Sequence, residues 1–203
     1  MKKVFLLLAL ACTIVACSDE KKSDKSGSDQ TATNAKSASV YKIGDYYNEN
    51  GKKGVVFEVS DGGNHGKIVS LDEAQLNWCT YDLYDRQIFI GASSKSDGKD
   101  NTYRVTDGPM NAWDQYPAFV FCRMKEGNDW YLPSKEELET IYNNRSKINQ
   151  TLSAKNGEEL KESYYWSSSE YDESWAWFVN MDGGYTNGAE KRMFYYVRAV
   201  ATF

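Results

Sequence analysis

The chain has 203 residues, with 24 lysines and arginines, 29 aspartates and glutamates and one histidine, giving a formal charge of −5. A hydrophobic fraction of 41%, with 14% aromatic residues, excludes disorder of the whole chain and suits one globular domain with attached segments. The acidic balance argues against a nucleic-acid partner, because phosphate neutralisation needs clustered basic side chains. A single histidine removes most His-based metal sites and Ser/His/Asp catalysis, and we expect no metal or other cofactor.

Residues 1–16 have the pattern of a signal peptide, in which two lysines precede an apolar run too short to span a bilayer. The run leads into Ile-Val-Ala-Cys at positions 14–17, which resembles the bacterial lipobox. In that motif the cysteine receives diacylglycerol before cleavage. The alternative is an ordinary secretory signal with an incidental cysteine. The sequence predicts that Cys17 is lipidated and inserts its acyl chains into outer-membrane lipid.

Residues 17–39 are predicted to form a lipidated, disordered tether. Positions 18–39 contain no aromatic residue, Ile, Leu or Val, so they cannot bury enough apolar surface to offset the entropy of ordering. Ser-Asp-Glu directly after Cys17 resembles the acidic tag that sends lipoproteins of some Gram-negative anaerobes to the cell surface, although ordinary linkers also contain acids. We expect a lipid-anchored, surface-facing outer-membrane protein whose folded domain spans residues 40–203.

The first part of this domain predicts a hairpin followed by a short helix. Val55, Phe57 and Val59 alternate as in a half-buried strand, and the Gly-rich turn at 61–66 returns the chain into a second strand. Ser70-x-x-Glu73 has the pattern of a capping box, which would open a helix carrying Leu71, Ala74 and Trp78 on one face. Residues 91–111 are polar and Gly-containing and predict a long surface loop.

The remainder predicts helices followed by strands. Pro117 can begin a short helix, and Ser134-x-x-Glu137 predicts a capping box for the longest amphipathic helix, with apolar positions from Leu138 to Leu152. Strand-like stretches follow at 164–168, 175–181 and 195–201, separated by turns. The expected fold class is α+β, with antiparallel strands at both ends and two or three helices mainly in the middle.

Four ordered motifs carry a family resemblance. They are Trp-Tyr-Leu-Pro-Ser at 130–134 with Glu-Glu-Leu at 136–138, Tyr-Trp-Ser-Ser-Ser-Glu at 165–170, Ala-Trp at 176–177, and Tyr-Val-Arg-Ala-Val at 196–200. This order resembles the Lcl C-terminal domain family, named for a bacterial collagen-like adhesin. The resemblance implies a C-type-lectin-like fold, related to formylglycine-generating enzymes and to diversified binding proteins.

The motif residues are first expected to serve the fold. Trp130, Trp166 and Trp177 are predicted to be buried core residues, because large aromatic side chains dominate small cores. Arg198 points away from its apolar neighbours on a strand and is predicted to pair with an acid such as Glu170. These residues explain a fold and leave function to be argued from a site.

Most chemistry is disfavoured. Cys79 and Cys122 either form a disulfide across the 42 residues at positions 80–121 or pack as two small buried hydrophobes. No cysteine follows Cys122, so formylglycine-generating activity is not carried over. His65 lies in a Gly-rich turn without a catalytic partner. No proline lies in the acid-Pro-Asn tripeptide of calcium-dependent lectins, so we expect no metal site.

The C-terminal turns supply the candidate binding surface. Rigid aromatic rings provide contact area, and small polar residues provide adaptable hydrogen bonds, as in antibody paratopes. The alternative is that the same residues only cover the sheet. The candidate ligand-binding residues are Tyr171, Asp172, Trp175, Asp182, Tyr185, Asn187 and Arg192.

The sequence therefore predicts a non-catalytic, adhesion-type surface lipoprotein that binds an extracellular glycan or protein. The alternative function is a structural or accessory subunit of a surface assembly such as a fimbria. An enzyme is disfavoured, because no nucleophile and base occur together in a recognisable pattern.

Overall fold

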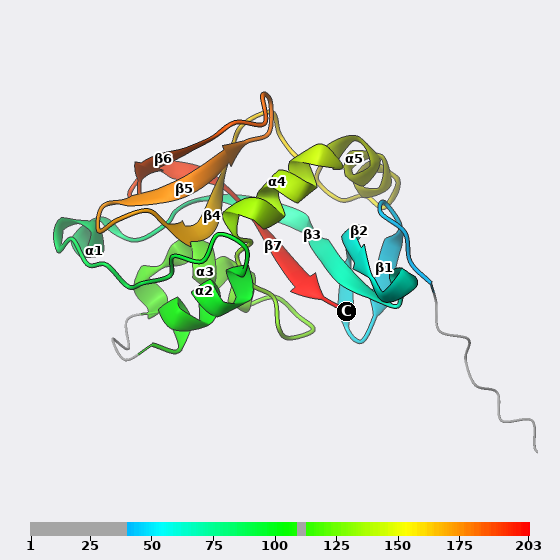
Figure 1. Cartoon of the computed structure of the whole chain (residues 1–203), viewed down its shortest axis with the longest axis horizontal. Coiled ribbons are helices and arrows are strands. Elements are labelled where there is room, and N and C mark those ends of the chain that lie inside the picture. The colour runs from blue at the N-terminus through cyan, green and yellow to red at the C-terminus, as the bar shows by residue number, and fades with distance from the viewer. Residues whose placement is uncertain (1–39, 109–112) are drawn as a thin grey trace, which may run out of the picture. The chain divides into compact units, whose positions relative to one another are not determined.

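The computed structural model describes residues 40–108 and 113–203, so the predicted signal peptide, Cys17 and the tether lie outside the described residues. In the described ranges, seven strands form one sheet in the order β1-β2-β3-β7-β4-β5-β6 (Figure 1). Neighbouring strands are antiparallel, except that β4 and β7 are parallel. The strands are β1 (Tyr46–Glu49), β2 (Lys52–Ser60), β3 (His65–Asn77), β4 (Tyr164–Glu170), β5 (Trp175–Asn180), β6 (Thr186–Glu190) and β7 (Phe194–Thr202).

The α-helices lie between β3 and β4 in the chain. The described residues contain five of them rather than the two or three predicted: α1 (Tyr81–Asp85), α2 (Gly98–Thr106), α3 (Pro117–Arg123), α4 (Lys135–Asn143) and α5 (Arg145–Ala154). Two 3-10 turns, η1 (Asp61–Gly63) and η2 (Trp113–Gln115), complete the set. The mixed architecture, with helices in the middle and strands toward both ends, agrees with the prediction. None of the helices described here is long and apolar enough to cross a bilayer.

The sheet separates two apolar clusters. Val56 in β2 packs with Phe119 and Cys122 of α3, whereas its neighbours Val55 and Phe57 pack with the residues of α4 and α5. Figure 1 shows α4 and α5 on one side of β7, with α2 and α3 on the other. Because both faces of the central strands are covered, β2 has a continuous buried run instead of the predicted half-buried alternation, while Val59 is 38% exposed.

The segment predicted as a helix from Ser70 is part of strand β3. An N-cap contributes about 1 kcal/mol, whereas this 13-residue strand pairs with β2 on one side and β7 on the other. The hydroxyl of Ser70 donates to the carbonyl of Asp72 at 2.9 Å instead of capping a helix. Residues 70–72 leave the ladder with β7 as a bulge, since Val69 pairs with Val200 and Glu73 with Arg198.

The predicted long loop at 91–111 contains α2. Asp97 caps this helix by accepting the backbone N–H of Asp100 at 2.8 Å, and Asn101, Thr102 and Val105 are buried. The segment carries few apolar residues, so its amphipathic pattern is weak. Polar burial supports the helix instead: the Asn101 amide bonds Ser94 and Ser168, and the Thr102 hydroxyl accepts the N–H of Leu132.

The second capping box is confirmed at the start of α4. Ser134 accepts the N–H of Glu137 at 3.3 Å, and the Glu137 carboxylate accepts the N–H of Ser134 at 2.8 Å. The same carboxylate also accepts from Tyr131 and forms an ion pair with Lys67, so the cap ties α4 to β3. The predicted single amphipathic helix is two helices, since α4 ends at Asn144 and α5 begins there.

The three C-terminal strands lie where they were predicted, and β6 is an additional strand in a segment interpreted as a turn. The predicted partner of Arg198 is wrong. Arg198 is fully buried and pairs with Glu73 at 2.6 Å, whereas Glu170 pairs with Lys191 at 2.6 Å. Arg198 is opposite Glu73 in the pairing of β3 with β7, a contact that links positions 125 residues apart.

Cys79 and Cys122 are free, buried thiols, so the structure favours small buried hydrophobes over a disulfide. Both belong to the apolar cluster on the α3 side of the sheet. Burial raises the pKa of the Cys79 thiol to about 12, and it raises the pKa of Cys122 as well. Both thiols are therefore protonated at neutral pH, a state typical of structural rather than reactive cysteines.

Candidate functional site

The candidate site is built on the three strands β4, β5 and β6 at one end of the sheet (Figure 1). Alternate residues of a strand point to opposite faces. Trp175 and Trp177 in β5 therefore share one face, and Ala176 and Phe178 share the other. Gly188 of β6 is opposite Trp177.

Three aromatic side chains gather on the first face, and we call Tyr171, Trp175 and Trp177 the aromatic face. Tyr171 is 55% exposed and Trp175 is 41% exposed. The rings of Tyr171 and Trp177 meet edge to face, with centroids 4.9 Å apart. Gly188 leaves room for them, because a Cβ atom there would come within 3.3 Å of the Trp175 ring.

Trp177 forms the inner part of the aromatic face. It is half-buried, rather than a fully buried core residue as predicted, whereas Trp130 and Trp166 are buried as expected. The ammonium groups of Lys95 and Lys135 lie 5.7 and 5.9 Å from the centre of the Trp177 ring. Cations at this distance are attracted by the ring quadrupole. These contacts fix Trp177 against the α4 side of the domain and leave Tyr171 and Trp175 at the surface.

Asp172 holds the turn that presents Trp175. Its carboxylate accepts the backbone N–H groups of Ser174 at 2.8 Å and Trp175 at 2.7 Å. The N–H of Tyr171 closes the same turn on the carbonyl of Trp175 at 2.9 Å. Asp172, predicted as a ligand contact, therefore has a structural role that preorganises the aromatic face.

Tyr185 lies on the opposite face from Trp175. The backbone pairing of Asn180 with Tyr185 places Tyr185 on the side of Phe178, and their ring centroids are 6.3 Å apart. Its hydroxyl donates to that of Tyr164 at 3.3 Å, a bond that lowers the pKa of Tyr185 and raises that of Tyr164. Tyr185 is 49% exposed, so both predicted aromatic residues are at the surface, but one ligand face cannot include both.

The other predicted ligand residues are dispersed. Asn187 is opposite Phe178, and thus on the Tyr185 side. Asp182 is exposed in the β5–β6 turn, where its carbonyl accepts from Arg145 at 3.1 Å. Arg192 pairs with Glu190 at 2.7 Å and stacks on Tyr84 beside α1. The predicted set therefore divides among at least three places, of which the aromatic face is the most concentrated.

Sequence reasoning missed Trp177, Lys95 and Lys135 as members of the site. The spacing Trp175-x-Trp177 in a predicted strand could have placed both indoles on one face. Nothing local in the sequence indicates the lysines, which come from the segment before α2 and from the first turn of α4.

The part of the chain that the structure describes holds no cluster of three or more metal-ligating side chains. His65 is exposed at the first position of β3. The hydroxyl and carboxylate groups of the aromatic face have no paired base with which to activate a nucleophile, so the arrangement favours binding.

A family model for the Lcl C-terminal domain matches residues 72–201, and the chain belongs to this family. The match includes all four motifs and both sides of the aromatic hairpin. A search of curated proteins finds no match.

Among solved structures, the fold is similar to that of a fimbrial protein from Bacteroides ovatus ATCC 8483, with a TM-score of 0.60 and 17% sequence identity. The alignment covers 80% of this chain and 49% of the fimbrial chain, so the protein spans about half the length of that relative. At this identity the likeness concerns the fold.

Proposed function

We propose that the protein is a surface-associated, non-catalytic binding protein whose aromatic face contacts an extracellular glycan or protein. The observation that carries the proposal is the exposure of Tyr171 and Trp175 side by side on a hydrogen-bonded turn. An exposed tryptophan brings no burial energy to folding, whereas a rigidly held ring loses little entropy on binding. Sugar rings and aromatic side chains both offer flat apolar faces to such a surface.

The C-type-lectin-like fold is part of this proposal. Membership of the Lcl C-terminal domain family supports it. So does the arrangement of one mainly antiparallel sheet with helices in the middle of the chain. A fold shared with binding domains leaves the ligand to be argued from the site.

The binding proposal is tested with soluble protein beginning at Ser18, screened on glycan arrays and against extracellular proteins. For the ligand so identified, Trp175→Ala is expected to weaken binding by about 2 kcal/mol or more, close to a thirtyfold rise in Kd, because exposed aromatic anchors dominate interface energy. Its free energy of unfolding should change by less than about 1 kcal/mol, as at other surface sites.

Tyr185→Ala is the matched control, since Tyr185 is similarly exposed but lies on the opposite face. It should leave Kd unchanged. If Tyr185→Ala abolishes binding while Trp175→Ala preserves it, the ligand face is the Tyr164 and Tyr185 side of the hairpin. If Trp175→Ala unfolds the domain, the ring is part of the scaffold.

Lipid anchoring at Cys17 completes the proposal and rests on the lipobox-like sequence at 14–17. Cys17→Ala should yield a protein without acyl groups that stays unprocessed or becomes soluble, because no acylated thiol remains. Mass spectrometry of the N-terminal peptide and membrane fractionation measure the result. Equal membrane partitioning of both proteins, with no acyl mass in the natural chain, contradicts the proposal.

A second candidate function is a subunit or accessory part of a surface assembly. The specific observation in its favour is the fold shared with the Bacteroides ovatus fimbrial protein. Light scattering of the soluble protein separates the two functions. A self-assembling subunit should form oligomers as concentration rises, whereas a binding domain of the first kind should remain monomeric.

A further inference from the structure

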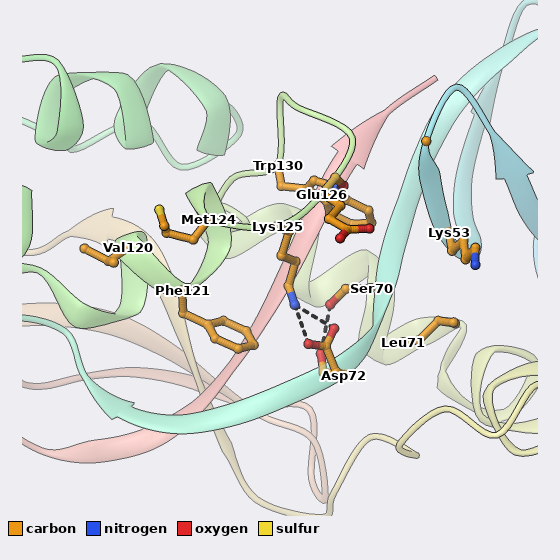
Figure 2. Close-up of a pocket in the computed structure, with 11 residues that line it drawn as sticks. Lys53, Ser70, Leu71, Asp72, Val120, Phe121, Met124, Lys125, Glu126 and Trp130 are labelled. Carbon is orange, nitrogen blue, oxygen red and sulfur yellow. Dashed lines mark hydrogen bonds and ion pairs between the residues drawn. The ribbon is translucent and has the colours of Figure 1, made fainter. Parts of the chain in front are cut away.

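A groove lies on the α3 side of the sheet, beside the bulge of β3 (Figure 2). It has a volume of about 530 Å³, which is within the range of small-molecule sites. Its walls come from β2, the bulge at 70–72, α3 and the segment that follows α3. The groove shares no residue with the aromatic face.

One wall of the groove is apolar. Leu71 from the bulge faces the groove together with Phe121 and Met124 from α3, and the buried Trp130 closes it. Met124 is 70% exposed, although a long apolar side chain gains by burial. The bulge is held rigidly, since Arg198 donates to the carbonyl of Ser70 at 2.9 Å.

Four charged side chains line the groove, two of each sign. Asp72 and Lys125 form an ion pair in which the ammonium lies 2.6 Å from both carboxylate oxygens, and the same ammonium lies 4.1 Å above the Phe121 ring (Figure 2). Lys53 and Glu126 form no ion pair with any residue in 40–108 or 113–203. The groove thus offers one unpaired cation and one unpaired anion beside an apolar wall.

This combination selects for a zwitterion with an apolar body. A ligand with a net charge would meet a like charge on the opposite wall, and an uncharged ligand would cover Lys53 and Glu126 without pairing them. The tether at 18–39 contains no aromatic residue, Ile, Leu or Val, so it cannot occupy the apolar wall. We propose that this groove binds a short apolar peptide with free termini, its carboxylate on Lys53, its ammonium on Glu126 and its side chains on Phe121 and Met124.

The test uses calorimetric titration of the full-length chain in lipid nanodiscs with the dipeptide leucyl-phenylalanine, and empty nanodiscs as the blank. Saturable binding with one peptide per chain is expected. Lys53→Gln and Glu126→Gln should each raise Kd about tenfold, the effect of one charge-assisted hydrogen bond. Lys161→Gln, an exposed lysine outside the groove, should not change Kd.

Peptide analogues assign each end. N-acetylation should weaken binding about tenfold to the natural chain and have no effect on Glu126→Gln. C-terminal amidation should do the same with Lys53→Gln as the insensitive variant. Both substitutions are at the surface, so thermal melts should match the natural chain.

Absence of saturable binding at millimolar peptide overturns the proposal. Equal loss on capping in the natural chain and in both variants also overturns it, because the termini then bind elsewhere or the groove accepts internal peptide segments. Binding that is lost with Trp175→Ala instead assigns the peptide to the aromatic face and not to the groove.

Discussion

Replacing Arg198 with Met is expected to lower the free energy of unfolding by about 3–5 kcal/mol, the cost of leaving one partner of a buried ion pair uncompensated. The guanidinium donates to Glu73 at 2.6 Å, to the carbonyl of Ser70 at 2.9 Å and to that of Glu158 at 2.7 Å. Glu73 also accepts from Tyr165 at 2.6 Å, and its side chain is only 1% exposed. Arg198 thus links three segments that are distant in sequence.

Urea unfolding measures the loss, with Arg192→Met as the control. Arg192 also pairs with a glutamate, Glu190, but both side chains are partly exposed, so its removal should cost about 0–1 kcal/mol. A loss of that small size for Arg198→Met would contradict the buried network.

A double variant refines the result. Glu73 Oε1 and Arg198 Nε have no hydrogen-bond partner among the described residues, so the pair is incompletely satisfied. Replacing both residues, Glu73→Leu with Arg198→Met, should recover part of the stability, because no buried charge then remains unpaired. Failure to recover would assign the stability mainly to the bonds that Arg198 makes with the carbonyls of Ser70 and Glu158.

Glu170→Gln is expected to lower the free energy of unfolding by about 3 kcal/mol. The Glu170 carboxylate is fully buried and pairs with the equally buried Lys191 at 2.6 Å. It also accepts the backbone N–H groups of Ile90, Gly91 and Ala92 at 3.0, 2.8 and 3.2 Å. A glutamine side chain presents an NH₂ group to these donors and leaves the Lys191 ammonium without a counter-charge.

The effect of Glu170→Gln should be local as well as global. Hydrogen exchange is expected to accelerate most at the amides of residues 90–92, because their shared acceptor is weakened. Glu139→Gln removes the partner of Lys135, a pair with partly exposed side chains, and should cost about 0–1 kcal/mol. Uniform acceleration across the domain, with no excess at 90–92, would contradict the role of Glu170 in holding that segment.

Several features could be predicted from the sequence because they depend on neighbours. The capping box at Ser134 and Glu137 and the helix start at Pro117 use contacts within one turn. The strands at 164–168, 175–181 and 195–201 follow from β-branched and aromatic runs between turns. The four family motifs were equally visible, and the family model confirms them.

Tertiary structure decided the features that depend on distant partners. The Ser70 and Glu73 capping pattern forms in a strand, because two neighbouring strands and Arg198 stabilise it more than one helical turn would. The acid that pairs with Arg198 is set by the register of β3 with β7, which no local pattern contains.

The same division applies to the candidate site. The sequence by itself determined that Trp175 and Tyr185 lie in polar turns and are exposed, because their neighbours cannot bury them. Only the pairing of β5 with β6 decided that the two rings point to opposite faces and that Tyr171 and Trp177 join Trp175. The physical reason is that exposure follows from local polarity, whereas the composition of a surface follows from strand register and from segments brought together by folding.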